Sequence, residues 1–251
     1  MSTSSPERDA LQQRSALVVG VGGLGCPVAL ALAEAGVGRI VLCDDDLVDA
    51  TNLHRQILFS EADVGSDKLE AAERELYRLG ARPGSIELVR SRFLPDNARA
   101  LAKSVDVVIE GADNFATKFL CADACFLEGR PVVHGAAVRW RATVLCAAAS
   151  GAPCYRCLFE DLPSGAAAPN CAEAGVVGPI VGFAGALMAD RALSVLLGDT
   201  RVFGNLVSFD GKIDRARELT LHARPRCALC SAERTIADIS YDRYTAAVCA
   251  A

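Results

Sequence analysis

The sequence predicts an α/β protein with a mostly parallel sheet. Residues 16–21 are a continuous apolar run that enters a glycine-rich turn, and an apolar helical pattern follows that turn. A second apolar run, residues 39–44, ends in acid, so the segment is typical of a strand, a tight turn, a helix and a strand. Strand and helix patterns alternate to residue 137, which predicts a Rossmann-like, doubly wound sheet covered on both faces.

The remaining elements are expected in order along the chain. Helices are predicted over 66–79, 97–105 and 115–128, and strands over 85–93, 106–113, 130–137 and 142–149. A loop rich in Cys, Pro, Gly and Ala follows over 150–174, then an apolar helix and a strand pair near 202–221. We expect this last pair to form an antiparallel extension of the sheet.

Composition limits the classes of function. The chain has 251 residues, 51% of them hydrophobic, and a formal net charge of −5, which suits one large domain with a substantial core. A sequence pI of about 5.3 argues against binding to nucleic acid or to a membrane surface. The apolar stretch 175–189 is closed by Asp190 and is shorter than the roughly 20 residues of a membrane span. It predicts a buried helix, with a subunit interface as one possible setting.

The cysteines indicate a reducing compartment. There are 11, an odd number, and the polar first 15 residues lack the apolar core of a secretory signal. We therefore expect a cytoplasmic protein with reduced thiols, in which paired cysteines indicate metal or redox sites before disulfides.

A glycine pattern predicts a nucleotide site. Gly20-x-Gly22-x-x-Gly25 lies between the first strand and the first helix of the βαβ unit, where backbone N–H groups can bind phosphates. Asp44, at the tip of the next strand, is placed to accept hydrogen bonds from ribose hydroxyls. Alone, these features favour an NAD or FAD enzyme over a tight turn without a ligand.

The following segment favours a nucleoside triphosphate instead. Asn52, Arg55, Gln56 and Lys68 have no obvious use in a nicotinamide site, whereas arginine and lysine neutralise a triphosphate under attack. Asp113 ends a later strand, where a carboxylate could hold the Mg²⁺ that a triphosphate brings. The alternative is that the Asp113-Asn114 pair only caps the next helix.

Two cysteine pairs predict a structural zinc site. Cys154-x-x-Cys157 and Cys227-x-x-Cys230 complete a tetrahedral shell with no open position. A redox pair would come singly, near the start of a helix. The zinc would hold together the ends of a region over 150–230, which follows a nucleotide-binding region over 16–149. An N-terminal tail over 1–15 and a C-terminal tail over 231–251 remain outside these two regions.

The other cysteines and the histidines are expected to have structural roles, with one possible exception. Cys171 lies in a loop of small residues and is a candidate nucleophile, although Glu173 would raise its pKa, so we expect a non-essential role. Core positions are expected for Cys26, Cys43, Cys121, Cys125 and Cys146, and surface or satisfied core positions for His54, His134 and His222.

Together these segments resemble the MoeB/ThiF/HesA family of ATP-dependent adenylyltransferases, relatives of ubiquitin-activating enzymes. The resemblance runs from about residue 15 to Cys230 and rests on GVGGLGCPVALALAEAGVGRIVLCDDD, TNLHRQ, VGSDK, EGADNFATK, VVHGAAVR, PCYRCLF, CAEAGVVGP and PRCALC. It implies activation of the C-terminal glycine carboxylate of a ubiquitin-like sulfur-carrier protein ending in Gly-Gly. The product would be an acyl adenylate, with release of pyrophosphate, and the enzyme would be a homodimer that uses ATP, Mg²⁺ and Zn²⁺.

The resemblance also implies roles for individual residues. Arg55 and Lys68 match the phosphate-binding cations, Asp113 matches the acid associated with magnesium, and Cys171 matches a loop cysteine that some members use covalently. The four paired cysteines match the zinc ligands. The implied nucleotide contacts are Gly22, Gly23, Asp44, Asp46, Thr51, Asn52, Leu53, His54, Arg55, Gln56, Lys68, Asp113 and Asn114.

Three departures from the family pattern qualify this expectation. The N-terminal segment lacks the Arg-Gln element that lends an arginine to the partner subunit, for which Arg8 or Arg14 could substitute. Lys118 stands where many members carry arginine. No rhodanese-like domain follows Cys230, so sulfur must come from a separate donor. A catalytically impaired binding scaffold of the same fold and an NAD-dependent oxidoreductase are the alternative functions.

Overall fold

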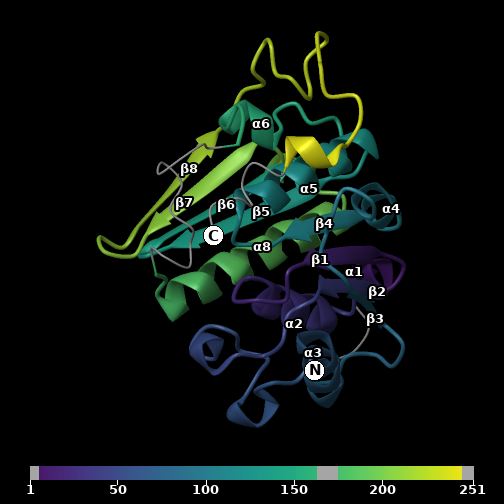
Figure 1. The fold of residues 1–251 in the computed structure, drawn as a ribbon, viewed down its shortest axis with the longest axis vertical. Helices are drawn as coiled ribbons and strands as arrows, with labels where there is room; N and C mark the ends of the chain where they lie inside the picture. Colours follow the sequence, from purple (N-terminus) through teal and green to yellow (C-terminus); the bar gives the residue numbers. More distant parts are fainter. Residues whose placement is uncertain (1–5, 163–174, 245–251) are drawn as a thin grey trace.

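The fold is known from a computed structural model, which describes residues 6–162 and 175–244 (Figure 1). Its centre is an eight-stranded sheet in the order β3-β2-β1-β4-β5-β6-β7-β8. The first five strands in the chain pair in parallel, and β6, β7 and β8 extend the sheet antiparallel, as predicted. The strands are β1 (Ser15–Val19), β2 (Arg39–Asp44), β3 (Ile86–Arg90), β4 (Val107–Glu110), β5 (Val132–Val138), β6 (Arg141–Ala147), β7 (Asn205–Asp210) and β8 (Arg215–Thr220).

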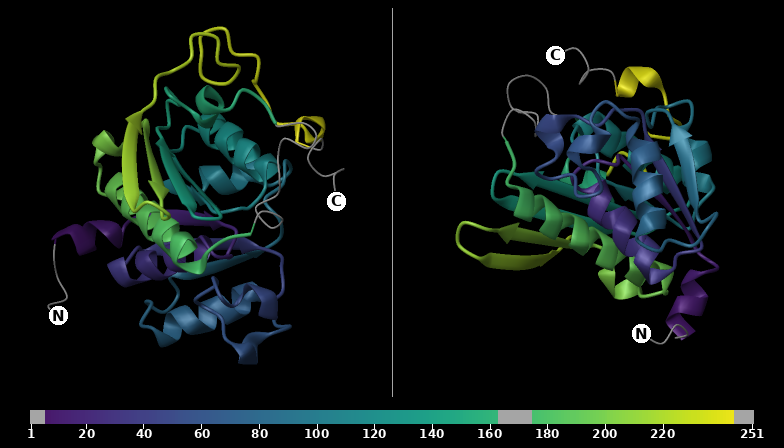
Figure 2. Two further views of the ribbon diagram at one scale, coloured as in Figure 1. Left: turned by 90° about the vertical axis from the view of Figure 1, so that its left-hand side faces the viewer. Right: turned by 90° about the horizontal axis from the view of Figure 1, so that it is seen from below.

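Helices cover both faces of the parallel part (Figures 1 and 2). One face is covered by α2 (Gly25–Ala35), α3 (Lys68–Arg78) and α8 (Gly178–Leu196), and the other by α4 (Ala98–Lys103), α5 (Phe115–Leu127) and α6 (Tyr155–Leu158). Alternate residues of each strand enter the two cores: Ala16 and Val18 lie in the first, Leu17 and Val19 in the second. This alternation explains the continuous apolar runs in the sequence, because both sides of each strand are buried.

The expected apolar helix is longer than its apolar stretch. α8 continues past Asp190 to Leu196, because the Asp190 side chain is exposed and costs little there. By length and mean hydropathy alone α8 could cross a membrane. Its buried side, however, packs against α2, β4, β5 and β6, as in the core helix of a globular domain.

Both predicted tails contain ordered structure. The N-terminal tail includes α1 (Pro6–Leu11), whose Leu11 is buried in the first core. The C-terminal segment crosses the α4–α5 side of the sheet and ends in η5 (Tyr241–Arg243) (Figure 1). Ile236 and Tyr244 of that segment are buried. The remaining short 3₁₀ helices are η1 (Ala50–Asn52), η2 (Glu61–Asp63) and η4 (Thr200–Val202).

Candidate active site and cysteine cluster

Three segments that are far apart in the sequence meet at the carboxyl-terminal edge of the parallel strands. The glycine loop follows β1, Asp44 ends β2, and Asp113 follows β4. β1 lies between β2 and β4, so the strand order reverses at this point. Open α/β sheets bind their ligands outside such a reversal. This edge is therefore the candidate nucleotide site.

The glycine loop approaches the start of α2 very closely. Gly20 has φ +84°, and a Cβ on Gly25 would lie only 1.9 Å from the Gly20 carbonyl oxygen. Cys26 N donates to Gly22 O, which closes the first helical turn. Within residues 6–162 and 175–244, no hydrogen bond uses the N–H groups of Gly22, Gly23 or Leu24. These donors at a helix N-terminus suit a phosphate.

Asp44 holds the loop from the neighbouring strand. Its Oδ2 accepts from Val21 N at 2.6 Å, and its Oδ1 accepts from Asp46 N at 2.9 Å. Burial raises the pKa of Asp44, while Lys68 and these two backbone donors oppose the rise. Asp44 therefore fixes the entrance to the glycine loop, and its contact with a ribose stays a prediction.

Lys68 is a buried cation at the same edge. It is the first residue of α3, its side chain is 5% exposed, and Nζ lies 2.8 Å from Asp46 Oδ2. The acids after β2 thus position a lysine as well as the loop. Direct contact between Lys68 and a phosphate stays a prediction.

The segment 51–56 lies across the glycine loop. The Arg55 stem passes over Gly23, where a Cβ would come within 3.3 Å of Arg55 Cγ and 2.7 Å of Val181 Cγ1. Arg55 Nη2 donates to Asn52 Oδ1 at 2.5 Å, and Nη1 lies 3.3 Å from His54 Nε2. These contacts hold the Arg55 side chain beside the glycine loop.

The other members of the segment support this arrangement. His54 Nδ1 lies 2.9 Å from Thr51 O, while Leu53 packs on the first core. Gln56 is 4% exposed and its Nε2 lies 3.6 Å from the position of a Gly22 Cβ. Gln56 Oε1 is buried without a hydrogen-bond partner in the part of the chain that the structure describes. An unpaired amide oxygen beside the glycine loop can accept a hydrogen bond from a bound ligand.

The Asp113-Asn114 pair divides into two roles. Asn114 Oδ1 accepts from Thr117 N at 2.9 Å and caps α5, so the capping interpretation holds for this residue. Asp113 is exposed, and its carboxylate has no hydrogen bond or ion pair to any residue in the described ranges. It is therefore free to bind a cation at this edge. Lys118, four residues after Asn114, is buried, and its ammonium group contacts Glu110 and the Gly135 carbonyl oxygen.

The N-terminal arginines lie away from this edge. The Arg8 side chain packs on Gly36, the C-cap of α2, whose other end begins at the glycine loop. A helix of this length is about 16 Å long at 1.5 Å per residue. Arg14 is exposed and precedes β1 at the opposite edge of the sheet. Neither arginine can reach the nucleotide site of its own chain.

The two cysteine pairs come together as predicted. The Sγ atoms of Cys154 and Cys227 are 3.5 Å apart, those of Cys157 and Cys230 are 3.4 Å apart, and those of Cys154 and Cys157 are 3.9 Å apart. All four are free thiols. A tetrahedral site with Zn–S bonds of about 2.3 Å places its sulfurs about 3.8 Å apart. The geometry therefore fits zinc.

The thiols of this cluster differ in how readily they ionise. Burial and the neighbouring thiolates raise the pKa of Cys154. Burial also opposes ionisation of Cys227, but the backbone N–H groups of Cys230 and Leu229 outweigh it and lower that pKa to about 7. Four thiolates can coexist here only around a positive ion, and a metal deprotonates its thiol ligands outright.

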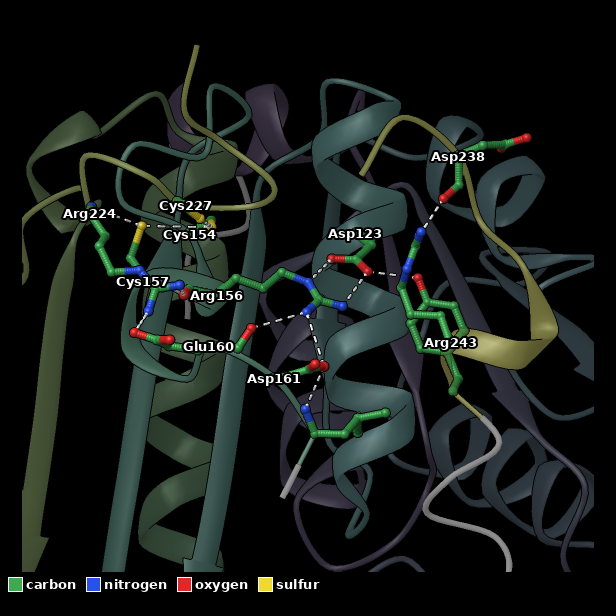
Figure 3. Close-up of polar contacts among 12 residues, drawn as sticks. Asp123, Cys154, Arg156, Cys157, Glu160, Asp161, Arg224, Cys227, Asp238 and Arg243 are labelled. Carbon is green, nitrogen blue, oxygen red and sulfur yellow. Dashed lines mark hydrogen bonds and ion pairs between the residues drawn. The ribbon is translucent and has the colours of Figure 1, made fainter. Parts of the chain in front are cut away.

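Arg156, between Cys154 and Cys157, connects the cluster to the rest of the fold (Figure 3). It is 2% exposed and makes a bidentate pair with Asp123 of α5 at 2.7 and 2.8 Å. Its carbonyl accepts from Arg224 Nη2, and its guanidinium lies over the Phe119 ring. Tyr244 completes the arrangement by donating to Asp123 Oδ2 at 2.7 Å. A single buried carboxylate thus joins α5, the cysteine cluster and the C-terminal segment.

Tyr244→Phe is expected to lower the free energy of unfolding by about 1.5–2 kcal/mol, because a hydrogen bond to a buried carboxylate is lost. Chemical denaturation measures the change. Tyr77→Phe is the matched control, since the Tyr77 hydroxyl has no hydrogen bond among the described residues. Equal stability of the two variants would show that the C-terminal segment is not held through Asp123.

The remaining thiols and histidines mostly follow expectation. The five predicted core cysteines are buried and free. His54 and His222 are exposed, but His134 is buried with Nε2 lacking a partner among the described residues, so it is not fully satisfied. Cys171 lies outside the described residues, and its role stays a prediction.

Comparison with known proteins identifies the family. A model described as the ThiF family matches residues 2–231. The chain belongs to the ThiF family. This membership confirms the MoeB/ThiF/HesA-type family that the sequence motifs predict.

Named relatives of this ThiF-family chain carry related activities. The adenylyltransferase and sulfurtransferase MOCS3 of Anopheles gambiae is 41% identical over 237 residues, which cover 93% of this chain and 54% of that protein. The chain thus spans about half the length of its MOCS3 relatives. The sulfur carrier protein adenylyltransferase of Thermus thermophilus is 39% identical over 234 residues, which cover 91% of this chain and 86% of that protein.

A solved structure shares the fold of this ThiF-family chain. Escherichia coli MccB, solved with MccA-N7isoASN, superposes with a TM-score of 0.78 at 22% sequence identity. The match covers 89% of this chain and 68% of MccB.

Proposed function

We propose that the chain is an ATP-dependent adenylyltransferase that activates the C-terminal glycine carboxylate of a ubiquitin-like sulfur-carrier protein. The observation that carries the proposal is the position of Arg55, whose aliphatic part lies across Gly23 of the glycine loop. Family membership and the named Thermus thermophilus relative support the same reaction class.

The division of charge at the edge suits a triphosphate with its metal. Asp44 is proposed to bind the ribose, and Arg55 and Lys68 are proposed to neutralise the phosphates. Asp113, exposed and unpaired among the described residues, would hold Mg²⁺. Bound Mg²⁺ supplies charge neutralisation at the phosphate oxygens.

The chemistry needs no general base. A terminal carboxylate has a pKa of about 3.3–3.7 and is ionised at neutral pH. One of its oxygens attacks the α-phosphorus, the bond to the bridging oxygen breaks, and pyrophosphate leaves with that electron pair, so the product is an acyl adenylate. The protein must align two anions and reduce their repulsion. Arg55 and Lys68 are placed for the second task.

The open face of the antiparallel extension is proposed to bind the carrier. Phe209 packs on Phe183 of α8 at 4.5 Å between ring centroids, so the neighbouring β7 residues point to the other face. The β7–β8 hairpin projects from the body of the molecule (Figure 2). Three cross-strand rows lie on this side of the sheet: Arg141–Asp210–Arg215, Thr143–Ser208–Arg217 and Leu145–Leu206–Leu219. In the third row Leu145 is buried in the second core and Leu206 packs against it, so Leu219 is the exposed member of that row.

This face suits a protein with an apolar patch and acidic surroundings. Leu219 is 50% exposed, and Arg215 and Arg217 form no ion pair within the described residues. The row at Arg141 is next to the turn after β5, at the same edge as the glycine loop. Strands are about 4.8 Å apart, so β8 lies roughly 24 Å from β1. An extended tail of seven or so residues, at about 3.3 Å each, spans that distance.

Three further features belong to the proposal. A homodimer is proposed, in which Arg8 or Arg14 acts on the nucleotide site of a second copy, because neither reaches the site of its own chain. Sulfur is proposed to come from a separate donor. The setting proposed is the cytoplasm, where the zinc-binding thiols stay reduced.

ATP–pyrophosphate exchange tests the proposal. We expect exchange that depends on Mg²⁺ and on a small ubiquitin-like protein ending in Gly-Gly, and Asp113→Ala is expected to reduce it at least about 100-fold. Each such protein encoded nearby is tested as the carrier, with its Gly-Gly deleted as the control.

The same assay separates the alternative functions. An impaired scaffold would bind the carrier and ATP without exchange, and an oxidoreductase would bind NAD instead of ATP. Full exchange activity in Asp113→Ala would contradict the metal assignment. Absence of exchange with every carrier would contradict the proposed activity.

A further inference from the structure

A buried charged cluster lies directly behind the loop that carries Asp113. Glu110, the last residue of β4, is completely buried, and Lys118 of α5 is 5% exposed. Lys118 Nζ lies 2.9 and 3.1 Å from the two Glu110 carboxylate oxygens and donates to Gly135 O at 2.6 Å. All three ammonium donors therefore have acceptors inside the protein, and none is left for a ligand.

Both carboxylate oxygens of Glu110 have further hydrogen-bond partners besides Lys118. Its Oε1 accepts from Ala112 N at 2.7 Å, and its Oε2 lies 3.1 Å from His134 Nδ1. Burial opposes ionisation of Glu110, but Lys118 outweighs it and holds the pKa of the carboxyl below its usual range. Burial lowers the pKa of His134. The cluster is thus an ionised pair beside a neutral histidine that donates through Nδ1.

This cluster fixes the backbone on both sides of Asp113. Glu110 accepts from Ala112 N on one side. On the other side Lys118 ties the first turn of α5, which Asn114 caps, to β4 and β5. Gly111 N also donates to Val19 O at 3.0 Å. The exposed, unbonded carboxylate of Asp113 therefore projects from a backbone that cannot move freely.

We propose that Lys118 and Glu110 are positioning residues that hold Asp113 for the magnesium of Mg·ATP, and that Lys118 does not contact phosphate. The inference rests on the proposed function, because it takes Asp113 to be the metal-binding acid. The groups that support a metal-binding carboxylate set its orientation, and their loss typically costs about 10–100-fold in metal affinity.

Calorimetric titration of ATP with and without Mg²⁺ separates the roles. A phosphate ligand contributes to binding in both conditions, whereas a residue acting through Asp113 contributes only to the gain in affinity that Mg²⁺ brings. We expect Glu110→Gln and Lys118→Met each to reduce that gain about 10-fold while metal-free ATP binds as in the wild type. Asp113→Asn is the reference for complete loss of the gain, and Lys103→Met, at an exposed lysine, is the matched control.

The double variant Glu110→Gln/Lys118→Met keeps the test decisive if a single variant unfolds. It leaves no unpaired buried charge, and replacing a buried pair by neutral groups of similar volume is tolerated. We expect the double variant to fold. Its Mg²⁺-dependent gain in ATP affinity should fall about as much as in each single variant, because Glu110 and Lys118 act as one unit.

Two results would overturn the inference while the metal site stands. Weaker metal-free ATP binding in folded Lys118→Met would make Lys118 a phosphate ligand. A normal Mg²⁺ gain in the folded double variant would reduce the cluster to a stabilising element. A normal gain in Asp113→Asn would instead overturn the metal assignment of the proposed function, and this inference with it.

Discussion

Cys154→Ser is expected to remove zinc from the protein and to lower its stability by several kcal/mol. Cys154 is 2% exposed, and its sulfur lies within 3.9 Å of two others of the cluster. Serine is a poor ligand, and without the metal the two segments that carry the pairs lose their main connection. Metal binding of this type contributes directly to folding.

The expected fall in Tm is roughly 10 °C or more, since 1 kcal/mol shifts a chain of this size by about 2–4 °C. Elemental analysis of protein purified without chelators measures the zinc, and thermal unfolding with and without a chelator measures its contribution. Cys146→Ala is the matched control, because Cys146 is equally buried but lies on β6 outside the cluster. Wild-type protein with no zinc, or Cys154→Ser with a full complement, would contradict the assignment.

The parallel part of the sheet could be predicted from the sequence because burial on both faces leaves a clear pattern. Residues 40–43 are all buried and all apolar, and the same holds for 107–109. β8 has no such pattern: RARELT is exposed along its whole length, and only its turn-flanked position next to β7 indicated a strand. The edges of the extension were accordingly predicted only approximately.

The C-terminal segment shows what pattern analysis misses. Ile236 and Tyr244 are isolated apolar residues in a polar sequence without periodicity, yet both are buried. Tyr244 is bonded to Asp123, a buried acid that also pairs with Arg156, whereas Ile236 packs beside Cys154, Cys227 and Leu229. An acid and a lysine inside the apolar segment FATKFLCADACFL were the available signal that α5 has buried polar partners.

The candidate site was predictable in its location but not in its contacts. Strand ends and the glycine spacing place Asp44, Asp113 and the glycine loop at one edge, because the topology of a parallel sheet requires it. That Arg55 lies over Gly23, or that Asp46 pairs with Lys68, depends on the course of the irregular segment 47–67. Its turns carry no periodic pattern, so these pairings could be found only in three dimensions.

Gly25→Ala is expected to abolish ATP binding and to lower the free energy of unfolding by about 3 kcal/mol or more. The new Cβ would lie 1.9 Å from the Gly20 carbonyl oxygen and 3.0 Å from its carbon, and both are backbone atoms. The loop cannot move aside easily, because Gly20 already has φ +84° and its N–H donates to Cys43 O. Forcing extra atoms into a packed site commonly costs about 1–3 kcal/mol, and here the obstacle is rigid.

Gly22→Ala is the matched control for this steric argument. A Cβ on Gly22 would meet only Gln56 Nε2, at 3.6 Å, which is ordinary contact with a side chain. We expect its Tm to stay within about 2 °C of the wild type, so any loss of ATP affinity would report on how closely the ligand approaches the loop. Calorimetric titration of ATP and thermal unfolding of both variants measure the difference. Wild-type stability and ATP affinity in Gly25→Ala would show that the contact between the loop and α2 can relax, and that the third glycine is not required for packing.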